Sequence, residues 1–215
     1  MDKKHVLEAL KKARESKKRK FSQSIDVVIS LKGLNLKKPE HQVDFFASIP
    51  FPTKKARICA FVQQEMRAAA QDACDAVVFE EDFPAYAKDK KKTKNLAKQN
   101  DFFIAQANLM PKVAAVFGKV LGPKGKMPNP KAGCVFAPKA QLKPIVEKLQ
   151  HTARISAKTT PVVQCIVGKE GMKDEDIASN IAGVYEQVVR HLPSDEQNIK
   201  SVLVKMTMGT PVRLK

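Results

Sequence analysis

Tryptophan is absent from this 215-residue chain, and aromatic residues of all kinds make up only 6% of it. Long apolar runs are also missing: none approaches the roughly 20 residues that a membrane-spanning helix needs. The N-terminus has no apolar stretch typical of a signal peptide. These absences argue against a membrane protein, and we expect a cytoplasmic one.

Cysteine and histidine are sparse, with four residues of each type. Cys59, Cys74, Cys134 and Cys165 lie far apart and form no CxxC pair, which argues against zinc and favours buried thiols in a reducing compartment. The scattered histidines are interpreted as surface or capping residues. Because no Ser/His/Asp, Cys/His or paired-carboxylate arrangement stands out either, the sequence predicts no catalytic residue, no cofactor and no metal ion.

Acidic residues are outnumbered, since 39 Lys+Arg against 22 Asp+Glu give a net charge of +17 and a pI of about 9.8. Such an excess favours an anionic partner, through counterion release if the partner is a nucleic acid. Charge alone does not separate RNA, DNA and an anionic membrane. The hydrophobic fraction of 43% is enough for packed cores, and the length suits one large or two modest domains.

The two ends of the chain share one kind of apolar pattern. Apolar and polar residues alternate, as in strands with one wet face, over residues 25–31, 43–49, 162–167 and 202–206. Helical spacing predicts amphipathic helices over residues 2–18 and 174–191. We expect residues 1–53 and 155–215 to fold together as a discontinuous two-layer α+β sandwich.

The middle of the chain has a different pattern, in which short apolar strands alternate with helices. The strands are predicted at 57–62, 76–79 and 102–105, and the helices at 63–73, 86–99, 111–120 and 140–149. This alternation is typical of parallel βαβ units covered on both faces. We predict that residues 54–154 form an inserted, small doubly wound (Rossmann-like) α/β domain. A nucleotide-dependent enzyme would need glycines after its first strand, and Val62-Gln63-Gln64-Glu65 has none.

Residues 121–133, LGPKGKMPNPKAG, are the most informative segment of the chain. Three glycines and three prolines cannot continue a helix or a strand, and they predict a shaped surface loop. A phosphate-binding P-loop is excluded, because its first glycine would fall at Val120 and Met127 stands where its hydroxyl belongs. Positive charges that suit a polyanion lie in the loop and just before it, at Lys119, Lys124, Lys126 and Lys131. We expect Lys126 to be a solvated charge; a solvated connector is the alternative for the whole loop.

This loop closely resembles the signature of the ribosomal protein L-one family, and the similarity extends over essentially the whole chain, most of all to the archaeal branch. Lys20-Phe21 followed by Ser24 and Asp26 resembles the family's N-terminal motif, and Thr207-Met208-Gly209 its Thr-Met-Gly. The resemblance implies a structural constituent of the large ribosomal subunit that binds its ribosomal RNA, forms the mobile stalk at the exit site and assists release of deacylated transfer RNA. Whether the protein also represses its own mRNA stays open, and we expect a monomer apart from the ribosome.

The resemblance also implies two RNA contacts. The first, to ribosomal RNA, would use Lys20, Phe21, Ser24, Asp26, Lys37, Lys38, Lys158, Thr207, Met208 and Gly209. The second, to transfer RNA, would use Lys119, Lys124, Lys126 and Lys131. Threonine would offer a hydroxyl to phosphate or 2′-OH, methionine would fill an apolar gap, and glycine would allow close approach. We also expect Gly209 to hold a φ that valine cannot adopt. The alternatives are a core role for Phe21 and an ordinary turn at Thr207–Gly209.

Two chain crossings between the domains, at about 52–55 and 154–157, predict a hinge at Pro52, Thr53 and Ile155. The family usually has Gly-Arg-Gly-Lys at the first crossing, whereas this chain has Phe51-Pro52-Thr53-Lys54-Lys55. The proline favours, as an alternative, one fixed open angle. A nonspecific RNA chaperone is the remaining alternative function.

Overall fold

The computed structural model describes residues 3–15, 19–38, 41–138 and 140–214. The chain divides into two compact units. Unit 1 is Met1–Lys54 together with His151–Lys215, and unit 2 is Lys55–Gln150. The predicted fold class is confirmed, because unit 1 has an antiparallel sheet and unit 2 a parallel one.

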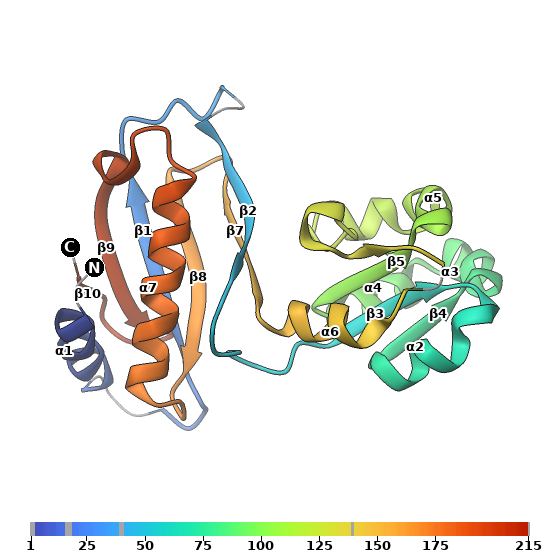
Figure 1. The fold of residues 1–215 in the computed structure, drawn as a ribbon, viewed down its shortest axis with the longest axis horizontal. Helices are drawn as coiled ribbons and strands as arrows, with labels where there is room; N and C mark the ends of the chain where they lie inside the picture. Colours follow the sequence, from blue (N-terminus) through green and yellow to red (C-terminus); the bar gives the residue numbers. More distant parts are fainter. Residues whose placement is uncertain (1–2, 16–18, 39–40, 139, 215) are drawn as a thin grey trace. The chain divides into compact units, whose positions relative to one another are not determined.

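Unit 1 is built on a four-stranded antiparallel sheet with the order β10-β9-β1-β8. Its strands are β1 (Ser24–Leu31), β8 (Val162–Lys169), β9 (Ile199–Met206) and β10 (Val212–Arg213). Two helices, α1 (Lys3–Arg14) and α7 (Asp174–Arg190), share one core with the buried face of this sheet, and Figure 1 shows α7 lying along it. The helix predicted over 2–18 is thus observed as α1, and residues 2 and 16–18 of that prediction lie outside the described ranges.

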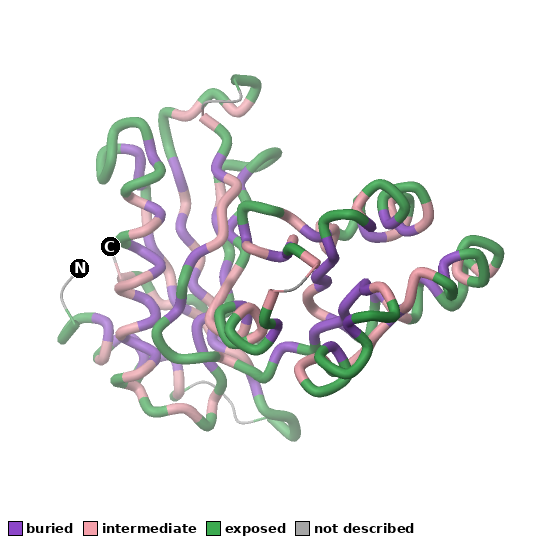
Figure 2. The backbone as a smooth tube through the Cα atoms, turned by 45° about the vertical axis from the view of Figure 1, so that its right-hand side comes forward, coloured by how far each residue is buried: buried purple, intermediate pink, exposed green. Residues whose placement is uncertain are grey.

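Alternation along the strands gives this sheet one buried and one open face. In β1, Ile25, Val27 and Ile29 are buried, and the residues between them are half-exposed. The same alternation of buried and more exposed positions runs along β8 and β9 (Figure 2). Helices α1 and α7 contribute to the core under the buried face. The residues between the buried ones, some polar and some apolar, form the open face.

A second, two-stranded antiparallel ribbon completes unit 1. It pairs β2 (Val43–Ser48) with β7 (Thr152–Ala157), and Phe45 lies opposite Ile155. We did not predict β7, and had placed the second crossing inside it. The prediction of Ile155 as a hinge residue is wrong, because Ile155 is paired in mid-strand and fully buried in the core of unit 1.

Unit 2 is a parallel sheet with the order β4-β3-β5-β6. Its strands are β3 (Ile58–Val62), β4 (Ala76–Phe79), β5 (Phe102–Gln106) and β6 (Val135–Phe136). Its α-helices are α2 (Arg67–Ala73), α3 (Phe83–Lys88), α4 (Lys90–Gln99), α5 (Met110–Leu121) and α6 (Leu142–Gln150). Every residue of β3 is buried, as expected for a strand covered on both faces.

Helices α3, α4 and α5 pack on one aromatic core. The ring of Phe61 in β3 lies 4.7 Å from that of Phe117 and 5.7 Å from that of Phe103, between ring centroids. The lysine-rich segment predicted as one helix over 86–99 is two helices instead. Asp89 separates them, because its side chain accepts hydrogen bonds from the backbone amides of Lys91 and Lys92 and so begins α4.

Candidate nucleic-acid interface

The two motifs predicted to bind ribosomal RNA meet at one end of the antiparallel sheet of unit 1. Although 183 residues separate them, the Ser24 amide donates to Thr207 Oγ1 at 3.0 Å. Thr207 Oγ1 in turn donates to the Ser24 carbonyl at 3.2 Å, and the Thr207 amide donates to the same carbonyl at 3.0 Å. The start of β1 therefore lies beside the end of β9, as the sequence predicts. The Thr207 hydroxyl, expected to face RNA, joins the two strands.

Beyond the last pair of β9 the chain turns, and the Gly209 amide donates to the Met206 carbonyl at 3.0 Å. The expectation of a special φ at Gly209 is wrong. Among the glycines of the described segments, a positive φ occurs at Gly33, Gly125 and Gly133. Any role of Gly209 therefore depends on its lack of a side chain.

Two large apolar side chains are exposed at this end of the sheet. Phe21 is 52% exposed and Met208 is 60% exposed. The alternative of a core role for Phe21 is therefore wrong. An exposed phenylalanine and an exposed methionine on adjoining segments offer a flat ring and an adaptable apolar contact to a partner.

A buried glutamine holds the exposed Met208 segment in place. Gln23 is 1% exposed, and its Oε1 accepts a hydrogen bond from the Met208 amide at 3.1 Å. Its own backbone amide donates to Glu170 Oε2 at 3.2 Å, and its carbonyl accepts from the Glu170 amide at 2.9 Å. Glu170, in the turn after β8, thus holds Gln23 in place, and Gln23 holds the turn after β9 through Met208.

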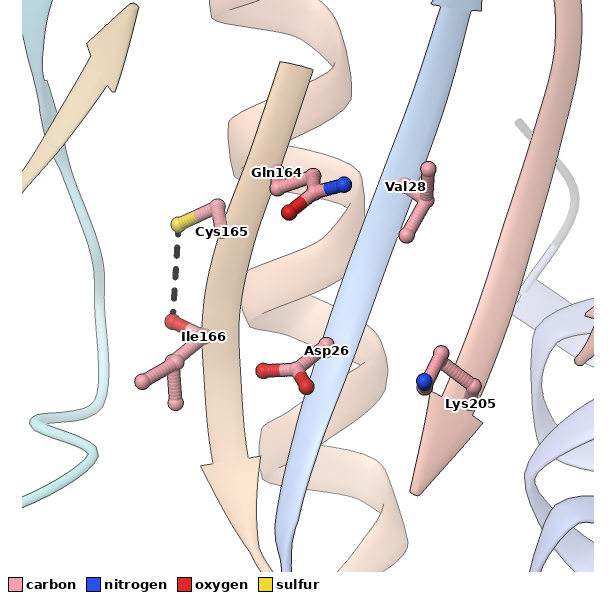
Figure 3. A pocket seen from close by; sticks show the side chains of 6 residues that line it. All are labelled: Asp26, Val28, Gln164, Cys165, Ile166 and Lys205. Atoms are coloured by element: carbon pink, nitrogen blue, oxygen red, sulfur yellow. Dashed lines mark hydrogen bonds between the residues drawn. The ribbon is translucent and has the colours of Figure 1, made fainter. Parts of the chain in front are cut away.

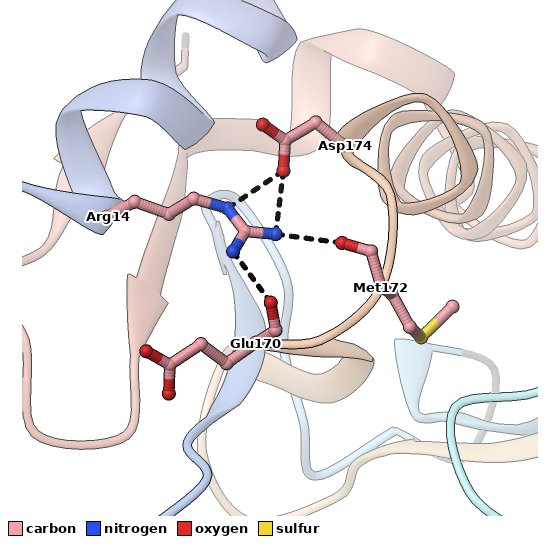
Figure 4. Close-up of polar contacts among 4 residues, drawn as sticks. All are labelled: Arg14, Glu170, Met172 and Asp174. Carbon is pink, nitrogen blue, oxygen red and sulfur yellow. Dashed lines mark hydrogen bonds and ion pairs between the residues drawn. The ribbon is translucent and has the colours of Figure 1, made fainter.

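Arg14, the last residue of α1, fixes that same turn after β8 (Figure 4). Its Nη1 donates to the Glu170 carbonyl at 2.7 Å, and its Nη2 to the Met172 carbonyl at 2.9 Å. Its Nε donates to Asp174 Oδ1, in the first turn of α7, at 2.8 Å. We did not single out Arg14 or Gln23 from the sequence, because their partners are mainly backbone groups far away along the chain.

Asp26 lies on the open face of the sheet, opposite Ile166 of β8 and Lys205 of β9. Figure 3 shows it among the side chains that line a shallow hollow there: Asp26, Val28, Gln164, Cys165, Ile166 and Lys205. Burial raises the pKa of the Asp26 carboxyl, and Lys205 offsets part of that rise. A carboxylate at this position can accept a hydrogen bond from a ribose hydroxyl but repels phosphate.

Three of the predicted lysines lie at the other end of the sheet. Lys37 and Lys38 follow Leu31, and β1 spans about 23 Å from Ser24 to Leu31 at 3.3 Å per residue. Lys158 follows the strand end at which Ala157 pairs with Val43. The structure therefore does not bring these lysines together with Thr207.

Lys158 also has a partner within the protein. Its Nζ lies 2.6 Å from Asp44 Oδ2, and the Arg154 Nε lies 3.4 Å from Asp44 Oδ1. Burial alone would raise the pKa of the Asp44 carboxyl, but these two cations hold it below its ordinary value. Lys20, at the Phe21 end, is exposed.

The glycine- and proline-rich loop of unit 2 is shaped as expected. Gly125 and Gly133 have φ of 64° and 74°, which only glycine adopts readily, and the loop follows α5 directly. The expectation of a solvated Lys126 is wrong. Its Nζ donates to the carbonyls of Ala97 and Asn100 at 3.0 and 2.7 Å, at the end of α4. The other three predicted lysines, Lys119, Lys124 and Lys131, are exposed.

The described ranges contain no group of three or more His, Cys, Asp or Glu residues placed to hold a metal ion. Within the same ranges, no helix has both the length and the apolar character needed to cross a membrane.

Fold and charge together define a class: a basic two-unit protein in which a parallel α/β unit interrupts an antiparallel α+β unit. Comparison with known sequences identifies the family within that class. The sequence model of the Ribosomal protein L1p/L10e family matches residues 10–210, and the chain belongs to this family. Because the family consists of structural ribosomal proteins, the chain is not an enzyme.

Three archaeal relatives match the chain over nearly their full length. The protein named large ribosomal subunit protein uL1 from Pyrobaculum calidifontis is 38% identical over 99% of this chain and 92% of its own length. Its namesake from Methanobrevibacter smithii is 40% identical over 97% of this chain and 98% of its own. The protein of the same name from Pyrococcus abyssi is 39% identical over 100% of this chain and 97% of its own length. The predicted family and its archaeal type are confirmed.

Proposed function

We propose that the chain is a structural constituent of the large ribosomal subunit in the cytoplasm, and that the end of unit 1 formed by Phe21–Ser24 and Thr207–Gly209 binds large-subunit ribosomal RNA. Family membership and the names of the relatives support the first part. The meeting of these two segments, far apart in sequence, supports the second.

The chemistry of this end suits folded RNA. The Phe21 ring can stack on an unpaired base, and Met208 can fill an apolar gap beside it. Gly209 exposes its backbone to close approach, and Asp26 can accept from a 2′-OH. Since these contacts fit shape and backbone more than base edges, we expect recognition of one folded region and not of a short sequence.

We propose a second RNA contact in unit 2, through the exposed lysines Lys124 and Lys131 of the loop and Lys119 in the last turn of α5. Its partner would be transfer RNA leaving the exit site, whose release the protein would assist. The first surface would also serve to bind the protein's own mRNA and repress its translation. Lys126, which caps α4, would take no direct part in either contact.

We also propose a hinge at the two connections between the units, with Pro52 and Thr53 absorbing the motion. Hydrogen bonds within each unit fix the chain on either side of the connections. In unit 1, the Ile49 amide donates to the His151 carbonyl at 2.7 Å. In unit 2, the Ala56 amide donates to Gln150 Oε1 at 2.7 Å. Single-molecule distances between dyes on the two units test it, and one narrow distance that RNA does not change would refute the hinge alone.

Binding measurements on the full chain test the main proposal. Overlapping folded segments of large-subunit ribosomal RNA are compared with an unrelated RNA duplex of equal length. One segment should bind more tightly, and its log affinity should fall by about 0.7–0.9 per log unit of salt for each phosphate contacted. Equal affinity for all RNAs would favour a nonspecific RNA chaperone and contradict the proposal.

A further inference from the structure

The densest positive charge of unit 2 lies on helices α3 and α4, outside the glycine- and proline-rich loop. Residues 55–150 contain 17 lysines and arginines against 9 acids, a net charge of +8. Six of those 17 cations fall within residues 88–98, and all six are exposed: Lys88, Lys90, Lys91, Lys92, Lys94 and Lys98. We refer to these six residues as the lysine ridge.

The acids nearest along the chain have other partners. Asp89, within the ridge, caps α4 by accepting from the amides of Lys91 and Lys92 at 2.8 and 3.2 Å. Before α3, Glu80 is bonded to Lys112 and Gln63. Among the residues that the structure describes, no lysine of the ridge forms an ion pair.

The ridge opposes the stability of its own helix. Lys90, Lys91 and Lys92 occupy the first turn of α4, where the helix dipole is positive and acids are favoured. Lys94 is four residues from both Lys90 and Lys98, a spacing at which like charges repel. Local choices that conflict with the fold are expected at functional sites. Folding therefore does not explain these charges, and a polyanionic partner does.

Other contacts hold α4 in a defined orientation. Thr93 and Ala97 are buried, and Thr93 Oγ1 donates to the Tyr86 carbonyl of α3 at 3.0 Å. Lys126 satisfies carbonyls at the end of the helix. With Thr93 and Ala97 inward, the helical period directs Lys91, Lys94 and Lys98 away from the core, over about 10 Å of helix. The packing of α4 therefore fixes the backbone positions from which these lysines extend.

We propose that the lysine ridge binds the phosphate backbone of double-helical RNA, as a surface distinct from the end of unit 1; the choice of RNA over DNA rests on the proposed function. A duplex offers the high charge density that such an array matches. The outward face of α4 carries Asn95 and Gln99 besides its lysines, so it has neither the aromatic rings that stack single-stranded bases nor the apolar residues that enter a membrane surface.

The test uses the full chain and a fluorescent RNA duplex of about 20 base pairs, unrelated to ribosomal RNA, between about 50 and 200 mM salt. The ridge variant carries Lys91→Gln, Lys94→Gln and Lys98→Gln. The control variant carries Lys3→Gln, Lys11→Gln and Lys12→Gln, three exposed lysines of α1, and so loses the same charge. We expect the ridge variant to bind at least about tenfold more weakly at low salt, with a salt slope lower by about two to three, at about 0.9 per phosphate contact. The control should change by less than about threefold, which is under 0.7 kcal/mol.

Stability gives an independent readout. Removal of the repelling lysines should leave the melting temperature unchanged or raise it, so weaker binding would not reflect unfolding. Wild-type affinity in the ridge variant, or equal losses in both variants, would overturn the proposal. The proposal would also be overturned if polyglutamate or anionic lipid vesicles, at equal charge concentration, displaced the labelled duplex as effectively as unlabelled duplex does.

The experiments distinguish failure of the ridge proposal from failure of the proposed function. The ridge variant should keep its affinity for the selected ribosomal RNA segment within about threefold. If wild-type protein selects no ribosomal segment, the proposed function fails, yet the difference between the ridge and control variants on the duplex still stands. If selection persists while that difference is absent, only the ridge proposal fails.

Discussion

Replacement of Gln23 by methionine tests whether the buried support beneath Met208 matters for RNA binding. Gln23→Met keeps nearly the same volume, so no large cavity or clash is expected. It removes the acceptor of the 3.1 Å hydrogen bond from the Met208 amide. The two hydrogen bonds that the backbone of Gln23 makes to Glu170, one with its carboxylate and one with its amide, do not depend on the side chain of Gln23 and should remain.

The size of the effect on stability and RNA binding depends on how exposed Met208, the hydrogen-bond partner of Gln23, is. A neutral hydrogen bond contributes about 1 kcal/mol, and a buried donor left unpaired costs about 1–3 kcal/mol. Because Met208 is 60% exposed, water can reach its amide, and the loss of unfolding free energy should be about 1 kcal/mol. The freed turn must be ordered again on binding, at about 1–2 kcal/mol for one residue, which weakens RNA binding about 5- to 30-fold.

Urea unfolding and titration with a fluorescent ribosomal RNA segment measure the two quantities separately. The matched control is Gln197→Met, which makes the same change at an exposed position and should alter neither quantity. Wild-type RNA affinity in Gln23→Met would refute the reasoning, because the turn would then hold its shape without this bond. Equal RNA losses in both variants would refute it as well.

Three further changes probe other parts of the structure. Lys126→Gln should lower the unfolding free energy by about 1–3 kcal/mol, because the carbonyls at the end of α4 lose a charged donor, whereas Lys124→Gln should be neutral in the same urea titration. Asp26→Asn should stabilise the protein at neutral pH: the folded state raises the pKa of this carboxyl, so the ionised form opposes folding above that pKa. This gain should vanish as the pH falls below the ordinary aspartate value, and a gain independent of pH in unfolding experiments would contradict the assignment. Gly209→Val should weaken binding of the ribosomal RNA segment by about 1–3 kcal/mol through contacts left unmade, and unchanged affinity would show that the backbone there does not approach RNA.

Burial leaves a periodic pattern in the sequence, and the elements with such a pattern were predictable. Residues 25–31 alternate because β1 buries one face, and residues 58–62 are wholly apolar because β3 is covered on both. Strand β7 was missed because Thr152–Ala157 has only Ile155 and Ala157 fully buried. Its partner β2 lies more than one hundred residues earlier, as the 110-residue separation of Asp44 and Arg154 shows.

The candidate site was predictable in part for the same reason. The Ser24 and Thr207 segments follow from the ends of periodic strands, and family motifs mark them. Side chains that bond to backbone carbonyls or amides leave no trace in the sequence, since every residue offers these groups. For this reason the sequence predicts a solvated charge at Lys126 and gives no signal at Gln23.

We expect the Phe21 and Met208 end of unit 1 to select large-subunit ribosomal RNA. Selection from a pool tests it most directly: the full chain is mixed with fragments of large- and small-subunit ribosomal RNA of equal length, and the bound RNA is sequenced. Four large apolar side chains are exposed in the described segments, which provides matched variants: Phe21→Ala with Met208→Ala, and Phe51→Ala with Ile166→Ala. We expect one large-subunit region to be enriched by the wild type and by the Phe51/Ile166 variant, and to be lost in the Phe21/Met208 variant. No enrichment over small-subunit fragments, or equal enrichment by both variants, would contradict it.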